Sequence, residues 1–163
     1  MDWHPWLMLL HVGAGFTFAL AHGVSAFTTL KLRGERDPAR VTALLDLSKY
    51  ALPVSDMAIL VLLISGIVAG FVGDDWGHLW IWVSIGVLVF LFAYMSLRGV
   101  KHHDAIRHAL GLAGFYDKKG APVPDADPAA LASALDSPRA VELAAVGGIG
   151  LLVILWLMIV QPF

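Results

Sequence analysis

Four long apolar stretches divide the chain, and shorter polar segments separate them. The stretches cover residues 6–30, 52–72, 79–97 and 141–160, and only Glu142, at the start of the fourth, interrupts them with a Lys, Arg or Glu. Each is close to or longer than the roughly 20 residues that a helix needs to cross a bilayer. The pattern predicts an all-α protein, an integral membrane four-helix bundle over residues 1–163, with loops at 31–51 and 98–140.

Composition supports this reading. Of the 163 residues, 58% are hydrophobic and 15% charged, more apolar side chain than a soluble domain of this size can bury. A net charge of −2 provides no basic field for nucleic acid, and the absence of Cys excludes thiolate metal sites. Residues 1–4 include no Lys or Arg, and no cleavage motif ends the first stretch, so we expect a retained helix.

The basic residues predict the orientation of the four helices. All of them fall in the first and third connections, at Lys31, Arg33, Arg36, Arg40, Lys49, Arg98, Lys101, Arg107, Lys118, Lys119 and Arg139. The positive-inside rule places these loops in the cytoplasm and both termini outside. The six Trp residues map to the outer helix ends and the three Tyr residues to the inner side, as interfacial anchors do.

The loops contain helix signals of their own. Asp37-Pro38 predicts a capped amphipathic helix reaching about residue 51, with Val41, Leu44, Leu45 and Ser48 on one stripe. Pro53 would kink this helix or start the second span. The third span could continue through residues 101–108, and residues 111–127 read as a loop before a cap at Asp127-Pro128. The glycines Gly66, Gly70, Gly147, Gly148 and Gly150 favour close packing, within the bundle or in a homo-oligomer.

Two histidines in the first span are the main candidates for chemistry. His11 and His22 are separated by about three turns, so they share a helix face at about 16 Å separation, with Gly15 near the same line. A flat macrocycle could lie there with histidine on iron, and an equally open alternative is that each imidazole bonds to a neighbouring helix. No other span carries a deep histidine, so a second axial ligand must be a different group, a histidine near a span end, or a residue of another copy.

The residues that could act together with His11 or His22 fall into two groups, according to their depth in the membrane. At the outer level His4, His11, Asp74, Asp75 and His78 could bind a transition metal or could be ordinary interfacial residues. At the inner level Ser25 and Asp56 could orient His22, although Asp56 could instead cap a helix that starts after Pro53. His102, His103 and His108 could form a metal cluster, but a solvated or headgroup-facing helix is favoured.

The order of these features resembles a known group. Leu10-His11-Val12-Gly13-Ala14-Gly15 in the first span, Pro53 through Leu63-Ile64-Ser65-Gly66-Ile67 in the second, and Trp80 with Trp82 in the third resemble small bacterial integral membrane proteins of uncharacterised function. They are more weakly similar to CopD-type copper-resistance proteins and HemJ-type protoporphyrinogen oxidases. This resemblance covers about the first 100 residues and implies a bacterial inner membrane location. In the HemJ-type group an early first-span histidine is associated with haem, and only His11 matches it by position.

Three functions therefore remain open. The leading hypothesis is a protein that binds haem b through His11 and His22, with a possible electron-transfer role. The second is transport or handling of copper or another transition metal through His4, His11 and His78. The third is a structural subunit whose histidines are merely hydrogen-bonded. No P-loop, Gly-x-Gly-x-x-Gly, His-Glu-x-x-His or Gly-x-Ser-x-Gly motif points to another chemistry.

Overall fold

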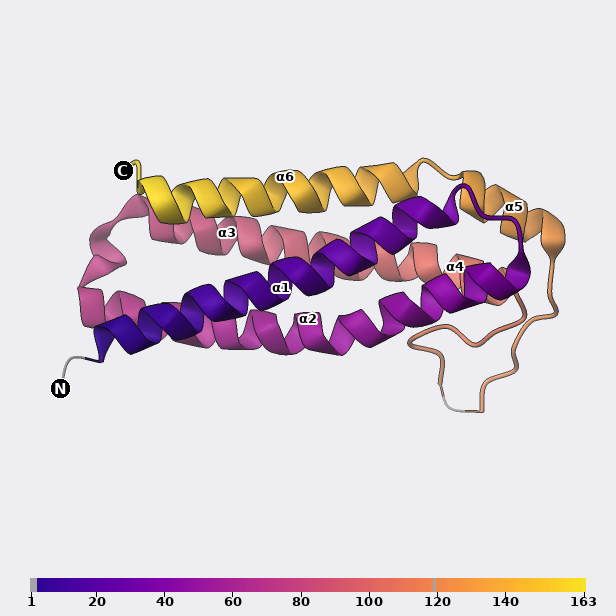
Figure 1. Ribbon diagram of the computed structural model, residues 1–163, viewed down its shortest axis with the longest axis horizontal. Helices are drawn as coiled ribbons and strands as arrows, with labels where there is room; N and C mark the ends of the chain where they lie inside the picture. The colour runs from indigo at the N-terminus through magenta and orange to yellow at the C-terminus, as the bar shows by residue number, and fades with distance from the viewer. Residues whose placement is uncertain (1–2, 119) are drawn as a thin grey trace.

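The computed structural model describes residues 3–118 and 120–163. Residues 1 and 2 lie outside the described part, and so does Lys119, one of the basic residues on which the predicted orientation rests. The long helical segments of the chain, called rods here, lie side by side (Figure 1). In chain order the elements are α1 His4–Leu32, α2 Pro38–Gly73, η1 Asp75–Gly77, α3 Leu79–Tyr94, η2 Met95–Gly99, α4 Val100–Ala109, α5 Pro128–Asp136 and α6 Arg139–Val160. The described residues contain no strand, which confirms the all-α prediction.

Four rods are long and apolar enough to cross a membrane: His4–Leu32, Pro38–Gly73, Leu79–Ala109 and Pro128–Val160. Each contains one predicted span, and the last three extend well beyond it. Their outward faces carry large apolar side chains, among them Phe16, Leu20 and Phe27 on α1, each about 70% exposed. Water would penalise such a surface, whereas lipid solvates it. The structure is therefore that expected of a multi-pass membrane protein.

The second rod is one helix where the sequence suggested a break. Asp37 caps it as predicted, since its side chain accepts from the Ala39 N–H at 3.0 Å, and Val41, Leu45 and Ser48 are buried. Helix α2 then continues through Pro53 to Gly73. Proline removes one hydrogen bond from a helix, a loss that neighbouring helices can tolerate in a membrane bundle. No separate helix begins after Pro53.

The third rod changes its winding partway along. Helix α3 passes into the π-helical turn η2 at Met95–Gly99 and continues as α4, so the predicted extension beyond the third span is confirmed. At this level Glu142 of α6 accepts a hydrogen bond from Tyr94 and lies 3.7 Å from Arg98. These contacts join the third rod to α6.

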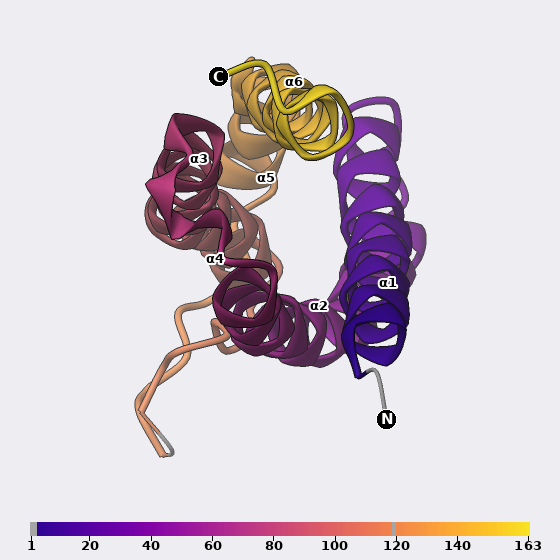
Figure 2. The ribbon, with the colours of Figure 1, turned by 90° about the vertical axis from the view of Figure 1, so that its left-hand side faces the viewer.

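Viewed from the end that carries the termini, the helices are arranged in a ring in the order α1, α2, α3 and α6 (Figure 2). Extensive packing joins α1 to α2, α6 packs on both α1 and α3, and α2 makes few contacts with α3. The termini and η1 lie at one end, called here the termini end, and residues 33–37, 110–118 and 120–127 lie at the other, the loop end (Figure 1). Seven buried residues form a small core at the loop end: Leu32, Val41, Leu45, Ile106, Ala109, Leu131 and Leu135.

Four of the predicted packing glycines face side chains of the same chain. Gly66 lies against His11, Gly70 against Trp76, Gly147 against His22 and Gly150 against Leu91. Gly148 has open space where a Cβ would stand. Glycine thus serves packing inside the bundle, and a homo-oligomer through these faces stays a prediction.

Candidate functional site

Two cavities lie between the four rods, and each receives one first-span histidine. The cavity toward the loop end, called the His22 cavity, has a volume of about 150 Å³. The cavity toward the termini end, called the His11 cavity, has a volume of about 200 Å³. His11 and His22 share a helix face as predicted, but they lie in separate cavities and cannot hold the same small group.

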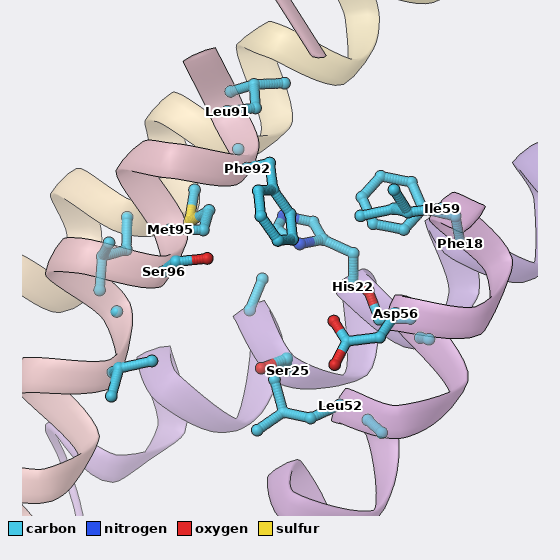
Figure 3. Close-up of a pocket in the computed structure, with 18 of the residues that line it drawn as sticks. Phe18, His22, Ser25, Leu52, Asp56, Ile59, Leu91, Phe92, Met95 and Ser96 are labelled. Carbon is cyan, nitrogen blue, oxygen red and sulfur yellow. The ribbon is translucent and has the colours of Figure 1, made fainter. Parts of the chain in front are cut away.

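His22 extends from α1 across its cavity toward the third rod (Figure 3). Its Nε2 atom is buried and has no hydrogen-bond partner. A Cβ added to Gly147 of α6 would collide with this atom, so the missing side chain of Gly147 provides the space that the imidazole fills. The Phe18 ring lies beside it, with 5.7 Å between ring centroids. The structure therefore holds an imidazole nitrogen in an apolar setting where nothing satisfies it.

The opposite wall comes from the third rod. Phe92, Met95 and Ser96 face His22 across the cavity (Figure 3), and Met95 and Ser96 belong to the π-helical turn. The Met95 methyl group lies 3.0 Å from the position that a Gly147 Cβ would occupy, the same point that His22 Nε2 approaches. A π-helical turn interrupts regular packing and is frequent at functional sites. Sequence reasoning did not single out Met95 or this turn.

The end of this cavity nearest the loops is polar. Ser25 of α1 and Ser48 of α2 form a hydrogen bond at 2.9 Å, so Ser25 does not orient His22 as expected. His103 donates from Nδ1 to the Gly99 carbonyl oxygen at 2.9 Å, and its Nε2 lies 3.2 Å from the Thr29 hydroxyl, which itself donates to the Ser25 carbonyl oxygen at 2.7 Å. Both nitrogens of His103 are therefore engaged, which leaves His22 as the imidazole with a free nitrogen here.

Asp56 lines the same cavity but does not play either predicted part (Figure 3). The structure gives it no hydrogen bond to His22 and no ion pair, and its side chain is exposed. It cannot cap a helix start, because α2 runs unbroken from Pro38 past this position. Gly15 also differs from expectation, since a Cβ added there would lie 3.6 Å from Leu62 Cδ1 and the residue lines neither cavity.

His11, in contrast, is hydrogen-bonded to α2. Its Nδ1–H donates to the Leu62 carbonyl oxygen at 3.0 Å, and the Ser65 hydroxyl lies 3.2 Å from the same nitrogen. His4 and Asp75 line the His11 cavity with it. His78 instead donates from Nδ1 to the Asp75 carbonyl oxygen at 3.1 Å and is exposed. Among residues 3–118 and 120–163, no three His, Asp or Glu side chains are placed to hold a metal ion, so the predicted outer cluster is not assembled.

The three histidines of α4 separate as well. His102 and His103 are buried, with exposed fractions of 3% and 9%, which contradicts the favoured prediction of a solvated helix. His108 pairs with Asp117, at 2.8 Å between Nε2 and Oδ2. The alternative of a metal cluster is also not formed among the described residues: the His102 and His103 rings are adjacent, with 5.9 Å between centroids, but no third ligand joins them.

Comparisons with protein-family models, with curated proteins and with solved structures find no match for this chain.

Proposed function

We propose that this multi-pass membrane protein binds haem b in the His22 cavity, with His22 as an axial ligand to the iron. The observation that carries the proposal is the buried Nε2 atom of His22, which has no partner. An unsatisfied buried polar group costs about 1–3 kcal/mol, and a bond to iron would remove that cost. The sequence predicted both His11 and His22 as haem ligands, whereas this proposal retains only His22.

The cavity lining suits an amphipathic planar group. Phe18, Ile59, Leu88 and Leu91 make the deeper wall apolar, while hydroxyl groups lie toward the loop end, on Ser25, Thr29, Ser55, Ser96 and Tyr116. A macrocycle would lie against the first set, and carboxylate side chains would accept hydrogen bonds from the second. The cavity volume of about 150 Å³ is below that of cofactor pockets, roughly 300–1,000 Å³, so haem would enter only if the helices around the cavity moved apart. Helices α2 and α3 make few contacts with each other, so their separation would disrupt the least packing.

Haem in this place would supply one-electron chemistry, with a potential set by its axial ligands and by the polarity around it. The chain itself would bind the iron through His22, keep water away with the apolar wall, and hold the polar groups through the Ser25–Ser48 and Thr29–His103 hydrogen bonds. We propose further that the loop end faces the cytoplasm of a bacterial cell, as the distribution of Lys and Arg predicts.

A haem titration of the purified full chain in detergent tests the proposal. We expect a Soret band that saturates at one haem per chain, and about tenfold or greater loss of affinity in His22→Ala. His11→Ala is the matched control, because His11 lies on the same helix but in the other cavity. Absence of the band in the wild-type protein, or equal titration of His22→Ala and wild type, would overturn the proposal.

One observation supports copper handling as a second candidate function. His4, Met8, His11 and Met158 all line the His11 cavity. Imidazole and thioether are ligands that copper(I) accepts, and the Nδ1 bond of His11 to Leu62 leaves its Nε2 as the coordinating atom. Metal analysis after exposure to copper(I) should give bound copper that His11→Ala loses and His22→Ala keeps. Equal copper in both variants would exclude this site.

A further inference from the structure

We propose that the His11 cavity binds a small primary ammonium ion with a short hydrocarbon chain. This cavity lies toward the termini end, whereas haem is proposed for the His22 cavity, so the two proposals are independent. The wall combines an imidazole, a carboxylate, two indole rings and two thioethers: His11, Asp75, Trp76, Trp80, Met8 and Met158. A primary ammonium group carries a positive charge and three N–H donors, and this wall offers it acceptors, a negative charge and aromatic rings.

His11 presents a hydrogen-bond acceptor to the cavity. Its Nδ1–H donates to the Leu62 carbonyl oxygen at 3.0 Å, so the neutral imidazole keeps its lone pair at Nε2. The Cε1 edge of the ring lies against Gly66, 2.8 Å from the position that a Cβ would occupy, whereas Nε2 lies 3.8 Å from that position. Nε2 has no hydrogen-bond partner among the described residues. An N–H group of the ligand would therefore supply the missing donor.

Asp75 supplies the negative charge. It lies in η1 at the termini end (Figure 1), and its carboxylate accepts no hydrogen bond in the described structure. His78 Nδ1 is 3.9 Å from Asp75 Oδ1, too far for a hydrogen bond. All Lys and Arg residues fall within 31–49 and 98–139, so none stands near this carboxylate in the sequence or at its end of the bundle. The charge at this end therefore favours a cation over an anion.

Trp76 and Trp80 provide apolar and aromatic surface for the body of the ligand. Trp80 is buried with Ile81 and Leu157, and Trp76 packs against the same cluster, so both rings are held in place. An indole face attracts a cation, which adds to the attraction of the carboxylate. The cavity holds about 200 Å³, compared with roughly 150 Å³ for a protein cavity that takes up benzene. A chain of about four to six carbon atoms matches this size.

Calorimetric titration of the purified full chain in detergent with n-butylammonium chloride tests the proposal. We expect saturable binding of one ion per chain, and no saturable binding of 1-butanol, which has the same hydrocarbon chain without the charge. Asp75→Asn should weaken the binding of n-butylammonium about tenfold or more, because the charge-assisted hydrogen bond is lost. Asp74→Asn is the matched control, since Asp74 is exposed in the same turn and does not line the cavity. Asn also tolerates its left-handed backbone, with φ of 56°.

Two histidine variants complete the test. His11→Ala should also weaken the binding of n-butylammonium, whereas His22→Ala, in the other cavity, should bind it as the wild type does. No saturable binding by the wild-type chain, or equal affinities of Asp75→Asn and Asp74→Asn, would overturn the proposal. Saturable binding of 1-butanol with the affinity of n-butylammonium would also overturn it. None of these results bears on haem, which the separate haem titration measures.

Discussion

The hydroxyl of Thr29 lies 3.2 Å from Nε2 of His103 and joins α1 to α4 at the loop end of the bundle. Both side chains are buried, at 4% and 9% exposure. Because His103 also donates to the Gly99 carbonyl oxygen, this contact holds the π-helical turn against α1. The π-helical turn is therefore connected to α1 at its Gly99 end through the buried side chain of His103.

Replacing Thr29 with Val should destabilise the protein by about 1–3 kcal/mol, because His103 Nε2 would lose its hydrogen-bonding partner while remaining buried. Thr17→Val is the matched control, since Thr17 bonds only to the Gly13 carbonyl oxygen and is exposed. Thermal unfolding in detergent measures both variants. Equal stability of the two would show that the Thr29–His103 bond contributes nothing.

The adjacent glycines of α6 offer a second test. Gly147→Ala should destabilise the chain by about 1–3 kcal/mol, because the new methyl group overlaps His22 and Met95. Gly148→Ala should be neutral or stabilising by up to about 1 kcal/mol, since its Cβ meets open space and alanine favours helix. Unfolding midpoints of the two variants decide the matter. Similar midpoints would contradict the close approach at Gly147.

The loop that follows α4 should depend on pH through Asp117. The hydrogen bond from His108, and then the Gly114 N–H, hold the pKa of Asp117 below its ordinary value of 3.8. A depressed folded pKa gives a contribution that is present above the unfolded pKa and is lost as pH falls through the folded one. Protection of residues 111–118 in hydrogen exchange should accordingly persist at neutral pH and fall below about pH 3.8.

Asp117→Asn should remove that acid-dependent step and loosen the loop at neutral pH, whereas Asp125→Asn, with an exposed side chain that makes no hydrogen bond in the described structure, should not. A wild-type step that survives unchanged in Asp117→Asn would assign it to other groups.

The absence of cysteine makes the orientation directly testable. Single cysteines at Gly77, in the turn of the termini end, and at Ala121, in the loop end, both stand at exposed positions. In intact cells a membrane-impermeant maleimide should label Gly77→Cys and spare Ala121→Cys until the cells are opened. The reverse pattern would refute the predicted orientation.

Local sequence signals account for the long helices and their caps. Apolar runs predict the four rods, and Asp37 and Asp127 each accept from backbone N–H groups as the cap-plus-proline pattern indicates. The π-helical turn at Met95 has no such signal, because its register depends on contacts with α1 and α6. Pro53 suggested a kink or a helix start, but α2 continues through this residue as one helix.

The site was less accessible from sequence. The separation of about 16 Å between His11 and His22 already implied two sites, although a shared face suggested one. Which imidazole keeps a free nitrogen depends on Leu62 and Ser65 of α2 beside His11 and on Gly147 of α6 beside His22. The burial of His102 and His103 likewise depends on tertiary packing. Their basic neighbours Lys101 and Arg107 favoured a solvated helix instead.

The central claim is that His22 Nε2 is the atom that binds haem iron, and chemical rescue tests it most directly. His22→Ala should titrate poorly with haem, and added imidazole should restore a low-spin Soret spectrum by entering the space that the side chain vacates. Imidazole should have no such effect on His11→Ala, which should already bind haem as the wild type does. Wild-type haem binding by His22→Ala without imidazole, or no haem binding by the wild-type chain at all, would contradict the account.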